Sequence, residues 1–462
     1  MSRLIVISNR VAVPKARGAA GAQGGLAGAL NSALKKHKGV WFGWSGETSD
    51  KADGTIHMQR SDDGVTTATI DLLPRDLDEY YNGYANATLW PLFHYRIDLT
   101  KYERETAKGY ERVNQRFADS VVPLIEDDDL VWVHDYHLLP LADRLRERGL
   151  NNRIGFFLHT PWPPTRLFVS LPFHERLVKT MLAYDLIGFQ TEEWRESFLH
   201  YCRKELQAEV NEETGRIVYD GSETIARAYP IGIDWDHFQE QGATGEARQA
   251  AQRLLSSTRR RIAMIGVDRL DYSKGLPERI DGIGRFFDQN PDKVRDLVYI
   301  QIAPPSREDV ESYQQIRATL EQKTGQINGA RSEVDVVPIR YVNRGYSHAE
   351  LFGFFSAAKI GLVTPLRDGM NLVAKEYIAA QNPDDPGVLI LSRFAGAAAQ
   401  LQDAVLVNPH SPDDLSHAIA KALDMQLPER KERYENLIRT VREDNVQGWT
   451  ENYVRDLEAV ER

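Results

Sequence analysis

The loop DRLDYSKG (268–275) places two cations beside a turn that ends in glycine. Arg269 offers a planar fork of donors and Lys274 a compact ammonium, a pair that suits a diphosphate. The helix start expected directly after the loop adds backbone amides that attract negative charge. The alternative is that Arg269 pairs with Asp271 inside the loop. We predict an anion-binding loop, because an apolar run typical of a strand ends just before it.

A second loop, PLRDGMNLVAKE (365–376), combines a tight Asp368-Gly369 turn with a helix that is expected to begin near Asn371. Such a turn points several backbone amides outward, where they could receive a leaving phosphate. Glu376 lies about one turn inside the helix and could accept hydrogen bonds from ribose hydroxyls. The alternative is an ordinary helix cap, in which Asp or Asn satisfies the first amides.

The first half of the chain carries its own polar loops. Gly24 and Gly25 lie in a glycine-rich turn after the first apolar run, but the spacing is not the G-x-G-x-x-G of nicotinamide cofactor sites. HDYH (134–137) has the residue types of a metal site, yet neighbours on an extended segment point to opposite faces. We interpret it as a loop that hydrogen-bonds a sugar.

Three D-x-D triplets could hold a metal ion in a different kind of sugar transferase, at 76–78, 127–129 and 234–236. None follows a clear strand of a nucleotide-binding βαβ unit. We interpret all three as solvated loops.

Short apolar runs alternate with amphipathic stretches nearly throughout, which is typical of βαβ units and parallel sheets. The predicted strands are 4–8, 130–134, 153–159, 185–190, 261–267, 297–304, 334–339, 360–365, 387–392 and 405–409. We predict an α/β protein with two Rossmann-like domains, 1–229 and 230–440, joined near 229–232. A C-terminal helix at 441–462, within a helical tail that starts near 427, is expected to pack back toward the first domain. Ligands of such sheets bind outside the carboxyl ends of the strands.

The composition of this 462-residue chain limits the classes of partner that it is expected to bind. Lys and Arg number 57 against 67 Asp and Glu, a net charge of −10, which argues against a nucleic-acid partner. The densest basic run, 259–261, is interpreted as a solvated cap on the strand that follows. No apolar run reaches the roughly 18–20 residues of a membrane span, and no secretory signal is recognised. The single cysteine, Cys202, is typical of a reducing compartment, and we expect a cytoplasmic protein.

A set of motifs in order along both halves resembles glycosyltransferase family 20, the family of the trehalose-6-phosphate synthases. The motifs are SNR (8–10), GGL (24–26), WFGWSGE (41–47), EYYNGYANATLWPLFHY (79–95), VHDYHLLP (133–140), NNRIGFFLHTPWP (151–163), RLDYSKGLPER (269–279), QIAPPSR (301–307) and VTPLRDGMNLVAKEY (363–377). The resemblance implies a GT-B fold and a retaining, metal-independent transfer of glucose from UDP-glucose to glucose 6-phosphate. The implied products are α,α-trehalose 6-phosphate and UDP, with no cofactor, and the implied assembly is a homo-oligomer, either a tetramer or a dimer.

The resemblance also implies a role for individual residues. Residues similar to the family's acceptor site are Arg10, Tyr81, Asp135 and Arg307. Residues similar to its donor site are Gly24, Gly25, Arg269, Lys274, Tyr346, Asp368, Gly369, Met370, Asn371, Leu372, Val373, Ala374, Lys375 and Glu376. Trp90 and His159 resemble residues near the reacting sugars, and Arg269, Lys274 and Asp368 are the remaining catalytic candidates.

The resemblance implies front-face transfer, in which the departing phosphate accepts the proton of the attacking hydroxyl. Double displacement would need a carboxylate nucleophile and an acid/base partner, and no such pair of loop carboxylates stands out. Two alternative functions of other classes are considered. One is a catalytically silent sugar-phosphate sensor with the same fold, which would be expected to lack Arg269, Lys274, Asp368 or Glu376. The other is a Rossmann dehydrogenase, which the missing glycine fingerprint disfavours.

Overall fold

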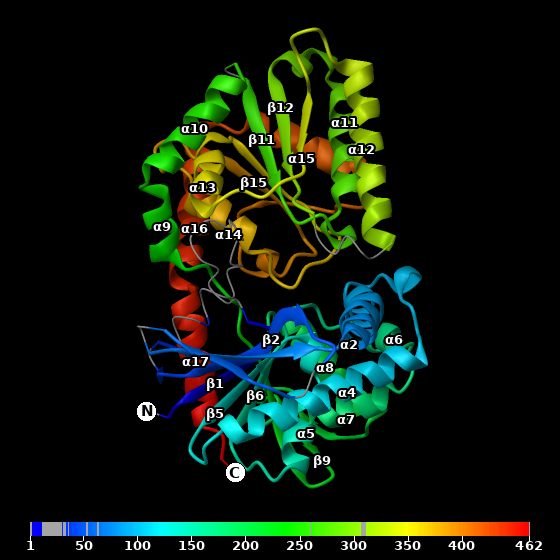
Figure 1. Ribbon diagram of the computed structural model, residues 1–462. Coiled ribbons are helices and arrows are strands. Elements are labelled where there is room, and N and C mark those ends of the chain that lie inside the picture. The colour runs from blue at the N-terminus through cyan, green and yellow to red at the C-terminus, as the bar shows by residue number, and fades with distance from the viewer. Residues whose placement is uncertain are drawn as a thin grey trace. The chain divides into compact units, whose positions relative to one another are not determined.

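The computed structural model describes residues 2–11, 30, 34–35, 37–51, 54–61, 64–259, 261–305 and 311–461. The chain divides into two compact units (Figure 1). The first contains the described residues up to Pro230 together with those from Gln447 onward, and the second contains Ile231–Val446. The chain therefore passes from the first unit to the second after Pro230 and returns after Val446.

The first unit is built on a sheet whose described strands lie in the order β3-β4-β2-β1-β5-β6-β7-β10-β9-β8. The strands from β4 to β10 in this order pair in parallel, and the outer strands β3, β9 and β8 pair antiparallel. The bounds are β1 (Leu4–Arg10), β2 (Val40–Thr48), β3 (His57–Arg60), β4 (Thr66–Leu72), β5 (Leu130–His134), β6 (Ile154–Phe157), β7 (Leu186–Phe189), β8 (Glu209–Asn211), β9 (Arg216–Tyr219) and β10 (Ser222–Ala228). All five residues of β5 are buried, as expected for a parallel strand covered on both faces.

The second unit has a sheet whose described strands are all parallel, in the order β13-β12-β11-β14-β15-β16. Their bounds are β11 (Ile262–Val267), β12 (Leu297–Ile302), β13 (Ile339–Val342), β14 (Ile360–Val363), β15 (Val388–Ser392) and β16 (Val405–Val407).

Both sheets have a topological switch point, where successive strands begin to add on the other side of the first strand. In the first sheet the chain proceeds from β1 to β2 and β4 and then places β5 on the opposite side of β1. In the second it proceeds from β11 to β12 and β13 and then places β14 beside β11. Loops after the two central strands diverge at such a point and leave a crevice for a ligand.

Helices cover the sheets of both units (Figure 1). Those of the first unit are α2 (Pro74–Asp76), α3 (Trp90–Phe93), α4 (Arg104–Val121), α5 (Leu141–Glu147), α6 (Thr165–Phe168), α7 (His174–Met181), α8 (Glu192–Glu205) and nearly all of α17 (Val446–Glu458), with a π-helix at Leu77–Leu89. Those of the second are α9 (Trp235–Gly242), α10 (Gly245–Ser257), α11 (Leu276–Gln289), α12 (Glu311–Arg331), α13 (His348–Ala357), α14 (Leu372–Ala379), α15 (Pro412–Asp424) and α16 (Leu427–Glu443). In the second unit α10 packs against α13, and α11 packs against α12 and α15. No helix in the described part of the chain is long and apolar enough to cross a membrane.

The last helix, α17, joins the first sheet through Tyr453. Its ring stacks on Trp132 with 4.4 Å between ring centroids, and its hydroxyl donates to the carbonyls of Phe156 (2.9 Å) and Leu186 (3.1 Å). A Cβ on Gly155 would lie 2.5 Å from the Tyr453 hydroxyl. Glycine on β6 therefore leaves the room that this tyrosine occupies.

The predicted α/β class with two Rossmann-like sheets is confirmed. One strand prediction was wrong in position. The segment 334–339 was expected to be extended, but β13 begins only at Ile339, where parallel pairing places it opposite Tyr299. Val334 is fully exposed, so its apolar character reflects no burial in the sheet.

The interpretation of the D-x-D triplets as solvated loops was wrong for two of their carboxylates. Asp76 is buried and pairs with Arg112 at 2.5 Å. Asp129 is buried and pairs with Arg3 at 2.7 Å. Both carboxylates are compensated inside the first unit, as burial of a charge requires.

Candidate active site

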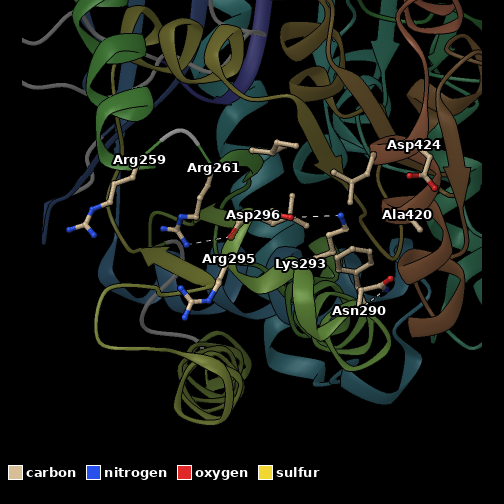
Figure 2. A pocket seen from close by; sticks show the side chains of 12 residues that line it. Arg259, Arg261, Asn290, Lys293, Arg295, Asp296, Ala420 and Asp424 are labelled. Atoms are coloured by element: carbon tan, nitrogen blue, oxygen red, sulfur yellow. Dashed lines mark hydrogen bonds and ion pairs between the residues drawn. The ribbon is translucent and has the colours of Figure 1, made fainter.

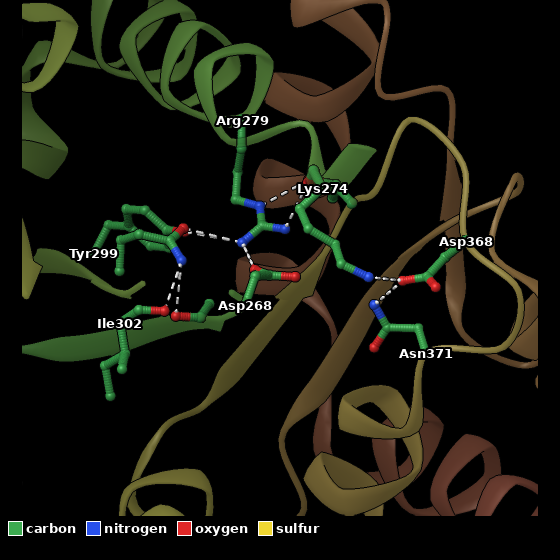
Figure 3. Close-up of polar contacts among 10 residues, drawn as sticks. Asp268, Lys274, Arg279, Tyr299, Ile302, Asp368 and Asn371 are labelled. Carbon is green, nitrogen blue, oxygen red and sulfur yellow. Dashed lines mark hydrogen bonds and ion pairs between the residues drawn. The ribbon is translucent and has the colours of Figure 1, made fainter. Parts of the chain in front are cut away.

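The two cation-bearing loops of the second unit meet at its switch point (Figure 3). The first loop follows β11 and the second follows β14, and the amide of Leu366 donates to the carbonyl of Ser273 at 2.8 Å. Across this junction the Lys274 ammonium lies 2.5 Å from the Asp368 carboxylate. The Asn371 side-chain amide donates to the same carboxylate oxygen at 3.0 Å. Three residues predicted separately from two loops therefore form one polar cluster.

The shape of the first loop follows from two local features. Asp271 is buried, and its carboxylate accepts from the Ser273 amide (2.9 Å) and the Tyr313 hydroxyl (2.9 Å), which fixes the turn that carries Lys274. Gly275 has a φ of +64°, and a Cβ there would lie 2.5 Å from the Thr364 carbonyl oxygen. A glycine is thus required where this loop turns into α11.

The second loop is held by the segment after β15. Asp368 donates its amide to the Phe394 carbonyl (3.2 Å), and its own carbonyl accepts from the Gly396 amide (3.1 Å). Asn371 has a φ of +77° and directly precedes α14. No acceptor within the described residues bonds the backbone amides of Gly369, Met370 and Asn371. These amides, together with the N-terminus of α14, suit an anionic ligand.

Two consecutive residues of α14 have opposite environments. Glu376 is partly exposed, burial among its neighbours raises the pKa of its carboxyl to about 7, and no described residue forms a hydrogen bond with that carboxyl. The Lys375 ammonium is buried and donates to the Ile231 carbonyl (2.8 Å) and the Gln400 side chain (2.7 Å). Burial lowers the pKa of Lys375 to about 8. Its ammonium is therefore bonded inside the second unit rather than to the loop that carries Asp368.

The contacts that the structure describes for Tyr346 are not with this cluster. The Arg344 guanidinium lies 4.6 Å from its ring centroid, and its ring meets the edge of Phe354 at 5.0 Å. Arg269 is exposed at the rim of the first loop.

The first unit gathers its candidates at the switch point between β1 and β5. Arg10 ends β1, with its guanidinium 5.6 Å from the Trp44 ring centroid. Tyr81 lies against Trp44, at 5.5 Å between ring centroids, and stacks on His137 at 5.8 Å. A cation and aromatic side chains at one strand edge are suited to a phosphorylated sugar.

Asp135 follows β5 with a φ of +74°, a conformation that costs free energy in a residue other than glycine. Its amide donates to the Phe157 carbonyl (2.8 Å), and its carboxylate accepts from the His159 amide (3.3 Å). Asp135 and His159 are thereby joined across neighbouring strand ends. The Trp90 ring lies in the same region, with its centroid 5.5 Å from that of the Tyr136 ring.

A pair of histidines lies behind this edge. Nδ1 of His134 is 3.1 Å from Nε2 of His159, and burial lowers the pKa of His159 to about 3. Burial and the neighbouring His159 also hold the pKa of His134 well below its usual range. Both rings are neutral at pH 7, so neither brings a positive charge to the site. No group of three or more His, Cys, Asp or Glu side chains in the described ranges could hold a metal ion.

Three predicted site residues, Gly24, Gly25 and Arg307, lie outside the described residues. A cavity of about 490 Å³ is present elsewhere, at the amino ends of β11 and β12 (Figure 2). It is lined by the first residues of those strands, Ile262 and Leu297, and by side chains that include Arg261 and Lys293. It lies at the edge of the second sheet opposite the Lys274–Asp368 cluster and is not part of the candidate site.

Comparison with known proteins decides the family. A family model described as glycosyltransferase family 20 matches residues 2–459. The chain belongs to glycosyltransferase family 20. Its two units are the two Rossmann-like domains of the GT-B fold.

Relatives match over almost their whole length. The trehalose-6-phosphate synthase of Sinorhizobium fredii is 45% identical over 460 residues, which is 99% of both chains. The structure of a Burkholderia xenovorans UDP-forming trehalose-phosphate synthase in complex with glucose-6-phosphate has a TM-score of 0.94 at 45% identity, covering 99% of this chain and 100% of the other. The Escherichia coli trehalose-6-phosphate structure bound with UDP-2-fluoro glucose has a TM-score of 0.94 at 43% identity, covering both chains fully.

The buried partners of these loops were not predicted from the sequence. Arg279, Asp268 and His134 were not singled out for the contacts that they make. One signal was available for Arg279: it lies three residues after Leu276 and one before Ile280, on the apolar face of α11. A charged residue in such a stripe needs a partner.

Proposed function

We propose that this chain is a retaining glucosyltransferase that moves glucose from UDP-glucose to glucose 6-phosphate. The products are α,α-trehalose 6-phosphate and UDP. The family match over residues 2–459 and the relatives of the same length support this proposal. The observation that carries it is the Lys274–Asp368 pair at the switch point of the second sheet, beside backbone amides that have no acceptor among the described residues. This cluster supplies positive groups for a diphosphate and a carboxylate for sugar hydroxyls.

On the donor side, Lys274 and Arg269 hold the β-phosphate, the amides of 369–371 receive its charge, and Glu376 accepts from the ribose. The complete donor set is proposed to be Gly24, Gly25, Arg269, Lys274, Tyr346, Asp368 and residues 369–376. Before the donor binds, Lys274 neutralises Asp368. The diphosphate then takes over the ammonium, and the carboxylate becomes available to the glucose hydroxyls.

On the acceptor side, the phosphate of glucose 6-phosphate is held by Arg10 and Arg307, and its sugar by Tyr81 and Asp135. The neighbouring rings of Trp44, Tyr81 and His137 support this placement, because they form an aromatic surface beside the Arg10 guanidinium. His159 and Trp90 border the reacting sugars. Since His159 is neutral at pH 7, it does not offer a proton to the departing phosphate in place of the acceptor hydroxyl.

The transfer proceeds on one face of the glucose. The bond from C1 to the β-phosphate oxygen breaks, the acceptor hydroxyl oxygen bonds to C1, and its proton passes to the departing phosphate. Lys274, Arg269 and the loop amides stabilise the charge that develops on that phosphate. Each fixed donor of this kind contributes about 2.7–4 kcal/mol of transition-state stabilisation.

The test is UDP release from UDP-glucose, followed with and without glucose 6-phosphate and with plain glucose as control. The proposal expects release that requires glucose 6-phosphate. A catalytically silent sensor would bind both ligands, as calorimetry would show, and release no UDP. Binding and turnover of nicotinamide cofactors would instead support a dehydrogenase.

We further infer that the protein works on small molecules, as a homo-oligomer, in the cytoplasm. The single cysteine, Cys202, is a free thiol, which supports a reducing compartment. Size-exclusion chromatography with light scattering tests the oligomer, and a monomer at assay concentration would contradict it.

A further inference from the structure

Arg279 is a fully buried charge directly behind the donor loops (Figure 3). It lies on α11, one turn after Gly275, and its exposed fraction is 0%. The same face of α11 carries Leu276, Ile280 and Ile283, which are all buried. A guanidinium in an apolar core loses its hydration and is kept only where its donors are satisfied.

The guanidinium bonds to three neighbouring strand ends at the switch point. It pairs with Asp268, which follows β11, at 2.6 Å, and it donates to the Thr364 hydroxyl, which follows β14, at 2.8 Å. It also donates to the Gln301 side chain on β12 at 3.0 Å and to the carbonyl of Lys274 at 3.4 Å. One side chain thus joins both loop-bearing strands and the backbone of the lysine that we place at the diphosphate.

The surroundings are built to hold this side chain in one position. The Gln301 amide donates to the carbonyls of Gly266 (3.2 Å) and Ile302 (3.1 Å), so its oxygen is fixed toward Arg279. The Tyr299 hydroxyl bonds to the same Gln301 oxygen. A Cβ on Gly266 would lie 2.4 Å from Nη1 of Arg279, so glycine on β11 opens the space that the guanidinium fills.

Stability alone does not explain such a network. Replacing a buried ion pair by well-packed apolar side chains is often neutral or stabilising, because desolvation offsets the attraction. The network instead fixes geometry, since a planar fork satisfies several acceptors only in one arrangement. The acceptors here belong to the two loops whose side chains meet as the Lys274–Asp368 pair.

We propose that Arg279 is the positioning residue of the donor site: it locks the ends of β11 and β14 in register so that Lys274 and Asp368 meet a nucleotide diphosphate sugar together. Arg279 does not touch the donor. This inference rests on the proposed function only for the identity of the ligand.

Two variants separate positioning from folding. Arg279→Lys keeps a charge beside Asp268, but one ammonium cannot reach Thr364, Gln301 and the Lys274 carbonyl together. The double variant Asp268→Leu/Arg279→Met removes both charges and is expected to remain about as stable as the natural protein. In both variants the ends of β11 and β14, and with them the two loops, should no longer be held in their relative position.

The matched control is Arg146→Lys. Arg146 pairs with Asp185 at 2.8 Å and donates to the carbonyls of Leu150 and Asn152. Asn152 lies two residues before β6 and Asp185 directly before β7, so this partly buried network lies at the amino edge of the first sheet, opposite the edge with the acceptor candidates. Its loss should lower the melting temperature without changing nucleotide affinity.

The experiment measures UDP affinity by calorimetry, thermal unfolding, and steady-state kinetics for the four proteins. We expect both Arg279 variants to bind UDP at least tenfold more weakly, with a raised KM for UDP-glucose, a lowered kcat and a KM for glucose 6-phosphate within twofold of the natural protein. Arg146→Lys should keep its UDP affinity. UDP affinities within twofold of the natural protein in both Arg279 variants, or an equal loss in Arg146→Lys, would overturn the inference. Failure of the natural protein itself to bind UDP would contradict the proposed function instead.

Discussion

Replacing Lys274 by methionine separates two effects of one ammonium: its ion pair with Asp368 and its proposed contact with the departing phosphate. The ammonium lies 2.5 Å from the Asp368 carboxylate, and the two side chains are only 11% and 13% exposed. A hydrogen bond between charged groups contributes about 1.5–3 kcal/mol, so Lys274→Met should lower the free energy of unfolding by that amount. In the proposed transfer the same ammonium holds the departing phosphate, and its loss should lower kcat by about 10²–10³.

The assays are urea unfolding and UDP release at saturating substrates, each with Lys274→Met, Asp368→Asn and the double variant. In unfolding, the double variant should lose less than the sum of the singles, because the second change removes a partner already lost. The kcat loss of Lys274→Met should exceed fiftyfold at temperatures well below its melting point. A kcat within fivefold of the natural protein, or strictly additive losses of stability, would refute the assigned pair.

Four further outcomes are expected. Because the pKa of Glu376 is raised to about 7, the folded protein binds more protons than the unfolded chain between about pH 4.5 and 7. The free energy of unfolding should therefore fall as pH rises through that window, whereas KM for UDP-glucose should fall as the carboxylate forms. In the Glu376→Gln variant, compared at pH 5.5 and 7.5, neither the stability nor the KM should show this dependence on pH. Arg10→Ala should raise KM for glucose 6-phosphate by about ten- to hundredfold and leave the donor KM unchanged, whereas equal losses for both substrates would contradict its role. Tyr453→Phe should lower the free energy of unfolding by about 0.5–1.5 kcal/mol in urea, and no loss would mean that its two hydrogen bonds are replaced by water. In the proposed transfer Lys274 and Arg269 neutralise the diphosphate, so excess EDTA should leave turnover unchanged, and a loss that Mg²⁺ restores would contradict this.

The strand ends that carry the site were predictable because parallel strands are buried on both faces. Runs such as LIVIS (4–8) and RIAMIGV (261–267) have no polar alternation, and the polar residues directly after them must lie at the sheet edge. The loops 268–275 and 365–376 could therefore be placed at ligand-binding edges from the sequence. The two loops meet at one switch point because of the order of the strands in the sheet, and the local apolar pattern does not predict that order.

Side-chain direction was less accessible to prediction. The family resemblance placed Lys375 in the donor segment 372–376, but it does not give the direction of the side chain, whose ammonium is buried against Ile231 and Gln400. The apolar segment before β13 shows a related limit. Val334 and Val337 are exposed, and the strand starts at Ile339, where pairing with β12 becomes possible. In both cases tertiary contacts outweigh a local pattern.

The proposed reaction transfers glucose from UDP-glucose to glucose 6-phosphate with retention of its anomeric configuration. Proton NMR of the isolated product tests this most directly, with the reaction run in EDTA. We expect one non-reducing disaccharide monophosphate whose two anomeric protons both have the small coupling constants of α-linkages, formed together with UDP. A β-linked or reducing product, or free glucose and UDP without a disaccharide, would contradict it.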